Sequence, residues 1–277
     1  MSLVLQVSDP HFGTERPEVV VALERLCARL RPDLLLMSGD ITQRARRSQF
    51  ERARAFVDRL AVPATLIIPG NHDIPLFNLP QRLLAPYRNF RRAFGAELAP
   101  QFENADLLAL GVNTTRWWRH ADGEVSAAQV QAVAQRLQRS RQQRPAQWRL
   151  VVVHQPVAVT RPQDRHNLLH GHEQALRAWS AAGADMVLGG HIHLPYVLAL
   201  HRQMAGLPNP IWAVQAGTAV SHRVRAEAGN SVNVIRAQAR TGPLTARRCS
   251  VERWDHDPGR DDFEPVALHP LDADHGP

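Results

Sequence analysis

The decapeptide LIIPGNHDIP (residues 66–75) joins a buried-strand pattern to a run of polar side chains. Its apolar start followed by Pro-Gly is typical of a strand that ends in a tight turn. A turn can use the Pro-Gly-Asn portion, because proline fixes φ and glycine or asparagine tolerates left-handed backbone. The turn gives no reason for His72 and Asp73 to follow. The stretch alone is equally consistent with a plain turn and with a functional site, so the rest of the chain must decide.

Short apolar runs alternate with amphipathic stretches over the first 190 residues. We expect strands over residues 3–8, 33–38, 64–69, 106–113, 149–154 and 185–190. We expect helices over residues 17–30, 48–60, 80–94, 126–143 and 172–182. Strands that alternate with helices predict an α/β fold with a largely parallel sheet.

The pattern changes after residue 194, where strand-like runs at 196–201, 211–217 and 231–237 follow without long helices. They predict a second sheet or an antiparallel extension packed on the first, within a single domain over residues 1–254. Residues 255–277 are rich in Pro, Asp and His without periodicity, and we expect them to form a mobile tail.

Polar side chains follow five of the predicted strands. They are Asp9 and His11; Asp40; Asn71, His72 and Asp73; His154; and His191 and His193. Each group alone is a weak signal, but the carboxyl ends of parallel strands meet at one edge of a sheet, where ligands bind. We therefore expect these side chains to converge.

The chemistry of the converging groups predicts a dinuclear metal site. Carboxylates, imidazoles and one amide oxygen are ligands that suit Mn, Fe or Zn in a catalytic site. A structural zinc site would contain cysteine, and a Ca²⁺ site would use oxygen ligands alone. A shared carboxylate would hold two ions about 3.5–4 Å apart, as in two-metal hydrolases.

Taken together, Asp9-x-His11, Gly39-Asp40, Gly70-Asn71-His72-Asp73, His154 and Gly190-His191-x-His193 resemble the motifs of the calcineurin-like metallophosphoesterase superfamily. The resemblance spans residues 9–193 and implies a four-layer α/β/β/α sandwich. It implies that Asp9, His11 and His193 bind one metal, that Asn71, His154 and His191 bind the other, and that Asp40 bridges them. It further implies that His72 faces the phosphoryl group as a catalytic residue, while Asp73 orients His72 or its loop.

The resemblance also implies a reaction. A hydroxide between the metals would attack phosphorus in line, and His72 would assist the leaving oxygen. The compact core and the GNHD form of the motif resemble small bacterial phosphodiesterases, so we expect hydrolysis of a small, cyclic or other nucleotide-type diester. A phosphomonoesterase and a nuclease acting on DNA or RNA are the alternatives, followed by a UDP-linked lipid pyrophosphatase; a metal-free scaffold would not need an intact site.

Four further residues are candidates for substrate contacts: Asn113, Trp117, His120 and His222. Asn113 ends a predicted strand at the same edge, and Trp117 with its neighbour Trp118 could form a wall for a base or an acyl chain. The two tryptophans could equally pack between layers.

The composition restricts the class of partner. The net charge is +7, but all 33 basic residues are arginine, which indicates a composition bias and only mildly favours an anionic partner such as nucleic acid. The two cysteines form no disulfide framework, and we see neither a signal peptide nor a membrane span. We therefore expect a cytoplasmic protein with a small phosphoester substrate; the sequence does not indicate the oligomeric state.

Overall fold

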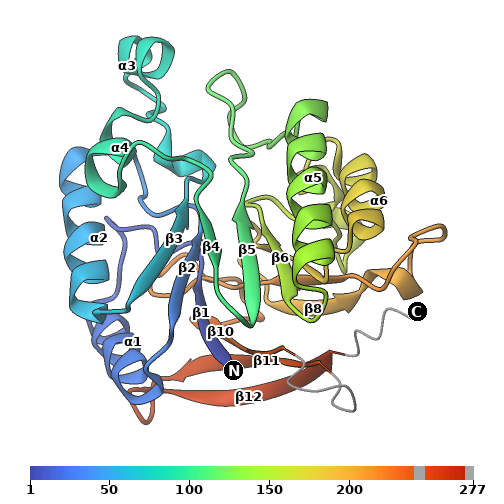
Figure 1. Ribbon diagram of the computed structural model, residues 1–277. Helices are drawn as coiled ribbons and strands as arrows, with labels where there is room; N and C mark the ends of the chain where they lie inside the picture. The colour runs from blue at the N-terminus through green and yellow to red at the C-terminus, as the bar shows by residue number, and fades with distance from the viewer. Residues whose placement is uncertain (240–246, 272–277) are drawn as a thin grey trace.

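The computed structural model describes residues 1–239 and 247–271 as four layers, with two sheets packed face to face between helices (Figure 1). The first sheet has the order β12-β11-β10-β1-β2-β3. Its strands are β1 (Ser2–Val7), β2 (Leu34–Ser38), β3 (Ala64–Ile68), β10 (Ser231–Gln238), β11 (Arg248–Asp257) and β12 (Asp262–Leu271). The second sheet has the order β4-β5-β6-β7-β9-β8. Its strands are β4 (Gln101–Glu103), β5 (Leu107–Gly111), β6 (Trp148–Val152), β7 (Met186–Gly189), β8 (Tyr196–Ala199) and β9 (Trp212–Gln215).

The described residues form six helices, most of which cover the outer face of a sheet. They are α1 (Pro17–Leu30), α2 (Arg47–Leu60), α3 (Leu79–Leu84), α4 (Arg88–Phe94), α5 (Ala127–Gln143) and α6 (His172–Ala182). Short 3₁₀ turns stand at Asn71–Asp73, Pro162–Asn167 and Leu200–Arg202. The predicted α/β/β/α sandwich is confirmed, with α1 and α2 on one side and α5 and α6 on the other (Figure 1).

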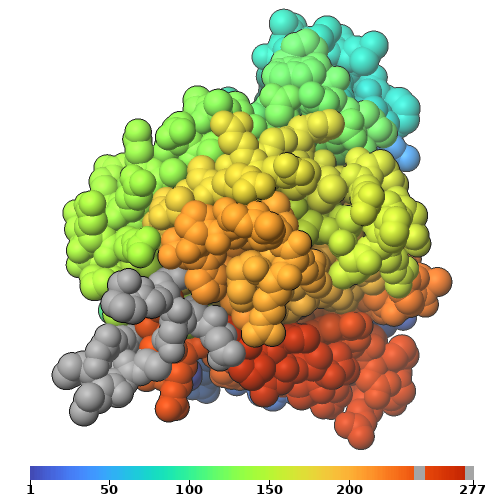
Figure 2. Space-filling model, turned by 90° about the vertical axis from the view of Figure 1, so that its right-hand side faces the viewer, coloured from blue at the N-terminus to red at the C-terminus, as the bar shows by residue number. Residues whose placement is uncertain are grey.

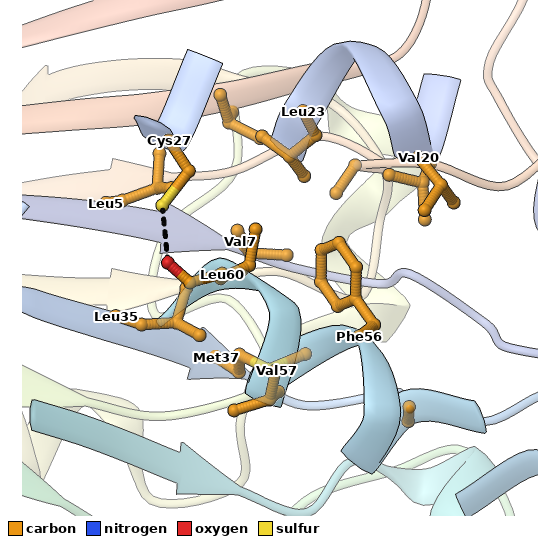
Figure 3. Packing of buried hydrophobic residues seen from close by; sticks show 14 of the residues in the cluster. Leu5, Val7, Val20, Leu23, Cys27, Leu35, Met37, Phe56, Val57 and Leu60 are labelled. Atoms are coloured by element: carbon orange, nitrogen blue, oxygen red, sulfur yellow. Dashed lines mark hydrogen bonds between the residues drawn. The ribbon is translucent and has the colours of Figure 1, made fainter. Parts of the chain in front are cut away.

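The period of two along each strand separates the apolar layers. In β2, Leu35 and Met37 pack under α1 and α2, whereas Leu34 and Leu36 join the cluster between the two sheets. Figure 3 shows the outer layer, where the buried Cys27 of α1 donates from Sγ to the Leu60 carbonyl at the end of α2. A third cluster lies between the second sheet and α5 and α6. Packing in these three apolar layers fixes the positions of the strand ends of the two sheets relative to one another.

The expectation that the parallel strands share one sheet is wrong. β1, β2 and β3 are parallel neighbours in the first sheet, and β5, β6 and β7 are parallel neighbours in the second. The later strands do not form a sheet of their own. Instead β10 extends the first sheet beside β1, whereas β8 and β9 extend the second. The periodicity of apolar residues predicts which face of a strand is buried, but it does not predict which strands pair with each other.

The helix predicted over residues 80–94 is two helices, α3 and α4. Pro86 lies between them, and the residue before it, Ala85, has an extended φ of −154°. Proline lacks the amide hydrogen and disfavours helical backbone in its predecessor, which explains the break.

The tail prediction is also wrong for residues 255–271. The predicted boundary at residue 254 falls inside β11, and β12 pairs antiparallel with β11 at the edge of the first sheet. Phe263 and Leu271 of β12 are buried, and Phe263 belongs to the cluster under α1. Figure 2 shows β11 and β12 along the lower side of the molecule. The proline, aspartate and histidine content of this segment hid the strand pattern of β12, which is a half-buried edge strand. The rest of the predicted tail, residues 272–277, lies outside the described residues.

Across residues 1–239 and 247–271, no helix combines the length and the apolar character that a bilayer crossing requires. Cys27 and Cys249 are both free and buried. The cytoplasmic location stays a prediction.

Candidate metal centre

The ends of five strands from two different sheets meet at one edge of the sandwich. Among the described residues, three groups of side chains bring ligand atoms within 4.8 Å of one another. They are Asp9, His11 and His193; His11, Asp40 and His72; and Asp40, His154 and His191. The predicted convergence is therefore present, although the strands that produce it do not share a sheet.

The backbone that presents these side chains is strained. Nine non-glycine residues of the described chain have positive φ, and five of them are predicted ligands: Asp9, His11, Asp40, His191 and His193. Such conformations cost free energy and persist at sites where the surrounding structure enforces them. Gly39, with φ +98°, lets the chain pass against the His154 ring, which a Cβ atom would strike.

The first donor set joins the loop after β1 to the loop after β7. Nε2 of His11 lies 3.1 Å from Nε2 of His193, and Oδ1 of Asp9 lies 3.3 Å from that same His193 atom. His193 donates from Nδ1 to the carbonyl of Arg223 at 2.6 Å, because a carbonyl oxygen only accepts. This bond leaves Nε2 free to act as a ligand.

The second donor set joins the loops after β2, β3, β6 and β7. Nε2 of His154 lies 3.3 Å from Oδ1 of Asp40 and 3.1 Å from Oδ1 of Asn71. Its Nδ1 donates to the Ser38 carbonyl at 2.8 Å, so this imidazole is also oriented by backbone. The His191 ring lies 5.1 Å from the His154 ring, measured between centroids.

Asp40 belongs to both neighbourhoods. Its Oδ1 faces His154, whereas its Oδ2 lies 3.8 Å from Nε2 of His11 in the first set. One carboxylate thus turns one oxygen toward each donor set, which is the geometry that a bridging ligand requires.

Two buried atoms without hydrogen-bond partners among the described residues support a cation site. They are Oδ1 of Asp9 and Nδ1 of His191. The other oxygen of Asp9 accepts from the Ser8 hydroxyl at 2.6 Å and from the His191 amide at 2.9 Å. Buried polar atoms are rarely left unpaired, so these two are suited to bind a cation. The residues present fit two cations.

The charge state of the donors agrees with this fit. Burial lowers the pKa of His11 to about 3 and that of His191 to about 4, which leaves both imidazoles neutral with a free lone pair. Burial alone would raise the pKa of Asp9, but the neighbouring His193 outweighs it and the pKa falls to about 2. Burial also opposes the charge of His154, yet Asp40 raises the pKa of that imidazole to about 9. A bound cation would replace this proton, since a metal ligand must be deprotonated.

His72 faces the same region. Its Nδ1 donates to the Gln43 carbonyl at 2.9 Å, which turns Nε2 toward the donor sets, and its ring lies 4.9 Å from the His11 ring. Its backbone amide donates to Oδ1 of Asp40 at 2.8 Å.

Asp73 lies behind the site. Its buried carboxylate accepts from the amides of Gly70, Ile41 and Thr42 and from the Thr42 hydroxyl, at 2.8–3.0 Å. Burial and the charge of Asp40 raise the pKa of Asp73 to about 7, against these hydrogen bonds. Of the two roles expected for Asp73, its contacts correspond to fixing the loop.

Arg223 is a residue of the site that sequence reasoning missed. Its Nη1 lies 3.1 Å from Nε2 of His72, 3.1 Å from Oε1 of Gln43 and 3.5 Å from Nδ1 of His11. The neighbouring His222 was singled out instead, but that side chain is exposed. The only signal was the position of their loop, which follows β9 and returns to the same edge.

The other substrate candidates occupy different places. Asn113 accepts from the amide and hydroxyl of Thr115 and so shapes its own loop. His120 lines a cavity of about 110 Å³ beside His72, with Asn71 also in its wall. Trp117 and Trp118 contact each other edge to face and are 38% and 58% exposed, so they do not pack between layers.

A sandwich with carboxylate and imidazole donors at its edge defines the metallo-dependent phosphatase fold. A dimetal phosphatase from Danio rerio is similar over 98% of this chain and 99% of its own, with a TM-score of 0.63 and 16% identity. The purple acid phosphatase PPD1 from yellow lupin (Lupinus luteus) is similar over 99% of this chain and 54% of its own, with a TM-score of 0.72 and 12% identity. At such identities the likeness concerns the fold alone.

The sequence itself specifies the family. Residues 2–195 match the family model described as calcineurin-like phosphoesterase, and the chain belongs to that family. A probable cyclic nucleotide phosphodiesterase from Synechococcus is 48% identical over 44 residues. That match covers only 16% of this chain and 17% of the relative.

Proposed function

We propose that this protein is a metal-dependent phosphodiesterase that hydrolyses small diesters, cyclic nucleotides among them. The observation that carries the proposal is the position of Asp40, which turns one oxygen toward His11 in one donor set and the other toward His154 in the second. A carboxylate shared between two donor sets suits two cations rather than one.

The proposed ligands are those expected from the motifs. Asp9, His11 and His193 would hold one cation, Asn71, His154 and His191 the other, and Asp40 both. The donor types suit Mn, Fe or Zn. Two such cations, when bound, supply Lewis-acid chemistry, since they neutralise phosphoryl charge and activate water.

The chain's own groups complete the site on the side of His72. Arg223 presents a guanidinium that can donate to phosphoryl oxygens as negative charge grows there. His72 is held at Nδ1 by Gln43, so a proton on Nε2 would be directed to the leaving oxygen. Binding of a phosphoryl group between the two side chains would replace their mutual contact.

The preference for a diester rests on the short match to the probable cyclic nucleotide phosphodiesterase. A monoesterase and a nuclease use the same chemistry, and the net charge of +7 would assist a nuclease.

An activity panel with added Mn²⁺ distinguishes these substrates. It would compare a nitrophenyl phosphodiester, the corresponding monoester, cyclic nucleotides and single-stranded DNA. We expect the diester and at least one cyclic nucleotide to turn over faster than the monoester. Monoester turnover far above diester turnover would refute the diester proposal, and preferential degradation of DNA would favour the nuclease.

A further inference from the structure

Large apolar side chains are exposed beside the mouth of the site. Of the eleven such side chains in the described chain, six lie in two segments around α3 and in the loop after β5. They are Phe77 (78% exposed), Leu79 (61%), Leu83 (57%), Leu84 (87%), Trp117 (38%) and Trp118 (58%), which we call the apolar rim. Scattered exposed apolar residues are ordinary on a protein surface, but a contiguous group marks an interaction site.

The two segments of the rim lie side by side. Arg82 of α3 donates from Nη2 to the carbonyl of Arg119 at 2.8 Å, next to Trp118, and from Nη1 to the Pro75 carbonyl at 3.1 Å. Both views show α3 and the loop after β5 projecting together beyond the sheets, opposite β11 and β12 (Figures 1 and 2). No residue of α3 is buried, so the apolar side chains of this helix are not part of the core.

The rim borders the candidate metal centre. The cavity beside His72 is also lined by Leu76 and Arg82, which lie next to rim residues just before and within α3, and by Arg44, whose guanidinium faces Phe77. A surface that covers the rim would therefore lie over the entrance to the site.

Positive charge accompanies the apolar side chains. Residues 76–84, which carry four of the six rim side chains, contain Arg82 and no acidic residue. The Arg44 guanidinium lies 5.4 Å from the centre of the Phe77 ring. None of the ion pairs formed by the described residues includes Arg44 or Arg82. Phe, Leu and Trp side chains next to arginines that form no ion pair among the described residues are the combination that binds the interface of an anionic bilayer.

We infer that the apolar rim docks onto the surface of an anionic phospholipid bilayer and holds the mouth of the site at the membrane. The apolar side chains would enter the boundary between headgroups and acyl chains, and the arginines would pair with anionic headgroups. The inference goes beyond the proposed hydrolysis and does not depend on it, since binding can be measured without turnover.

The test is co-sedimentation of the full chain with vesicles of phosphatidylcholine, alone or mixed with phosphatidylglycerol. We expect binding to the anionic vesicles that weakens as salt is added. The double variant Leu83→Ser/Leu84→Ser should lower the partition coefficient by about 10-fold or more, because two apolar side chains are lost from the interface. The matched control is Val266→Ser/Leu268→Ser on β12, whose side chains are 54% and 62% exposed, and it should bind like the parent.

Two results would overturn the inference: a parent protein that does not bind anionic vesicles, or equal binding by the parent and the rim variant. A rim-dependent dimer in sedimentation velocity without vesicle binding would also overturn it and assign the rim to a second copy. If the double variant fails to fold, quenching of tryptophan fluorescence by brominated lipids in the parent protein tests whether the rim enters the bilayer. Quenching that is lost in Trp118→Phe supports docking, whereas absence of quenching in the parent contradicts it.

Discussion

The guanidinium of Arg223 lies 3.1 Å from Nε2 of His72, although the two residues are 151 positions apart in the sequence. Arg223 also holds the ring of His193 through its backbone carbonyl. One residue of the loop after β9 thus contacts both the proposed catalytic imidazole and a proposed metal ligand. It does so with two different groups, so a side-chain substitution removes only the first contact.

The variant Arg223→Gln should lower kcat/KM for a diester by on the order of 10²–10³-fold, because a charged donor to the phosphoryl group is lost. Metal content should be unchanged, since the carbonyl that orients His193 remains. Inhibition by inorganic phosphate should weaken in parallel. The same substitution at the exposed Arg202 serves as the control, and equal losses in both variants would contradict the assignment.

The variant His72→Asn should keep its metal but lose rate by about 10²–10⁴-fold. The loss should be greatest for substrates with poor leaving groups, because these depend most on proton donation. Metal analysis and a series of phenyl-substituted diesters measure the two effects. A metal-replete variant with an unchanged rate would remove His72 from the proposed mechanism; His166→Asn, an exposed imidazole, is the control.

The variant Asp40→Asn should reduce bound metal and leave under about 1% of the activity, because the amide cannot supply two anionic oxygens to two donor sets. Added Mn²⁺ should raise the melting temperature of the parent more than that of the variant, since a ligand that binds only the folded state stabilises it. Asp58→Asn removes an exposed carboxylate as a control. Parent-like metal content in Asp40→Asn would argue against the bridge.

The variant Asp73→Asn should destabilise the protein by about 1–3 kcal/mol, because an amide group cannot accept all the hydrogen bonds that the buried carboxylate accepts. Urea unfolding measures the change. If Asp73 instead served only as a partner for the substrate, activity would fall while the unfolding midpoint stayed where it is in the parent.

The variant Phe263→Ala should lower the free energy of unfolding by about 3–5 kcal/mol, since the ring is fully buried under α1. Val266→Ala on the same strand is the control, and it should change stability by less than about 0.5 kcal/mol, because Val266 is 54% exposed. Equal stability of both variants would mean that β12 contributes little to the folded state.

The hydrophobic pattern and the helix-capping residues predicted most helices and strands, because the formation of these elements depends largely on residues that are neighbours in the chain. Helix α1 begins at Pro17 as proline at a first turn predicts, and Ser126 caps α5 with its side chain. The pattern failed where another signal competed with it: Pro86 divides a helical run, and polar residues conceal the edge strand β12. The donor residues were predicted to meet because each directly follows a strand.

The sequence by itself determined the alternation of strands and helices, the family and the set of donor side chains at the strand ends. Only the tertiary structure decided that β3 and β5 belong to different sheets, that Asp40 faces both donor sets, and that Arg223 rather than His222 reaches His72. The reason is physical. Hydrophobic periodicity and backbone preference are properties of residues close in the chain. Pairing of strands and the reach of a loop side chain depend on packing between residues far apart in it.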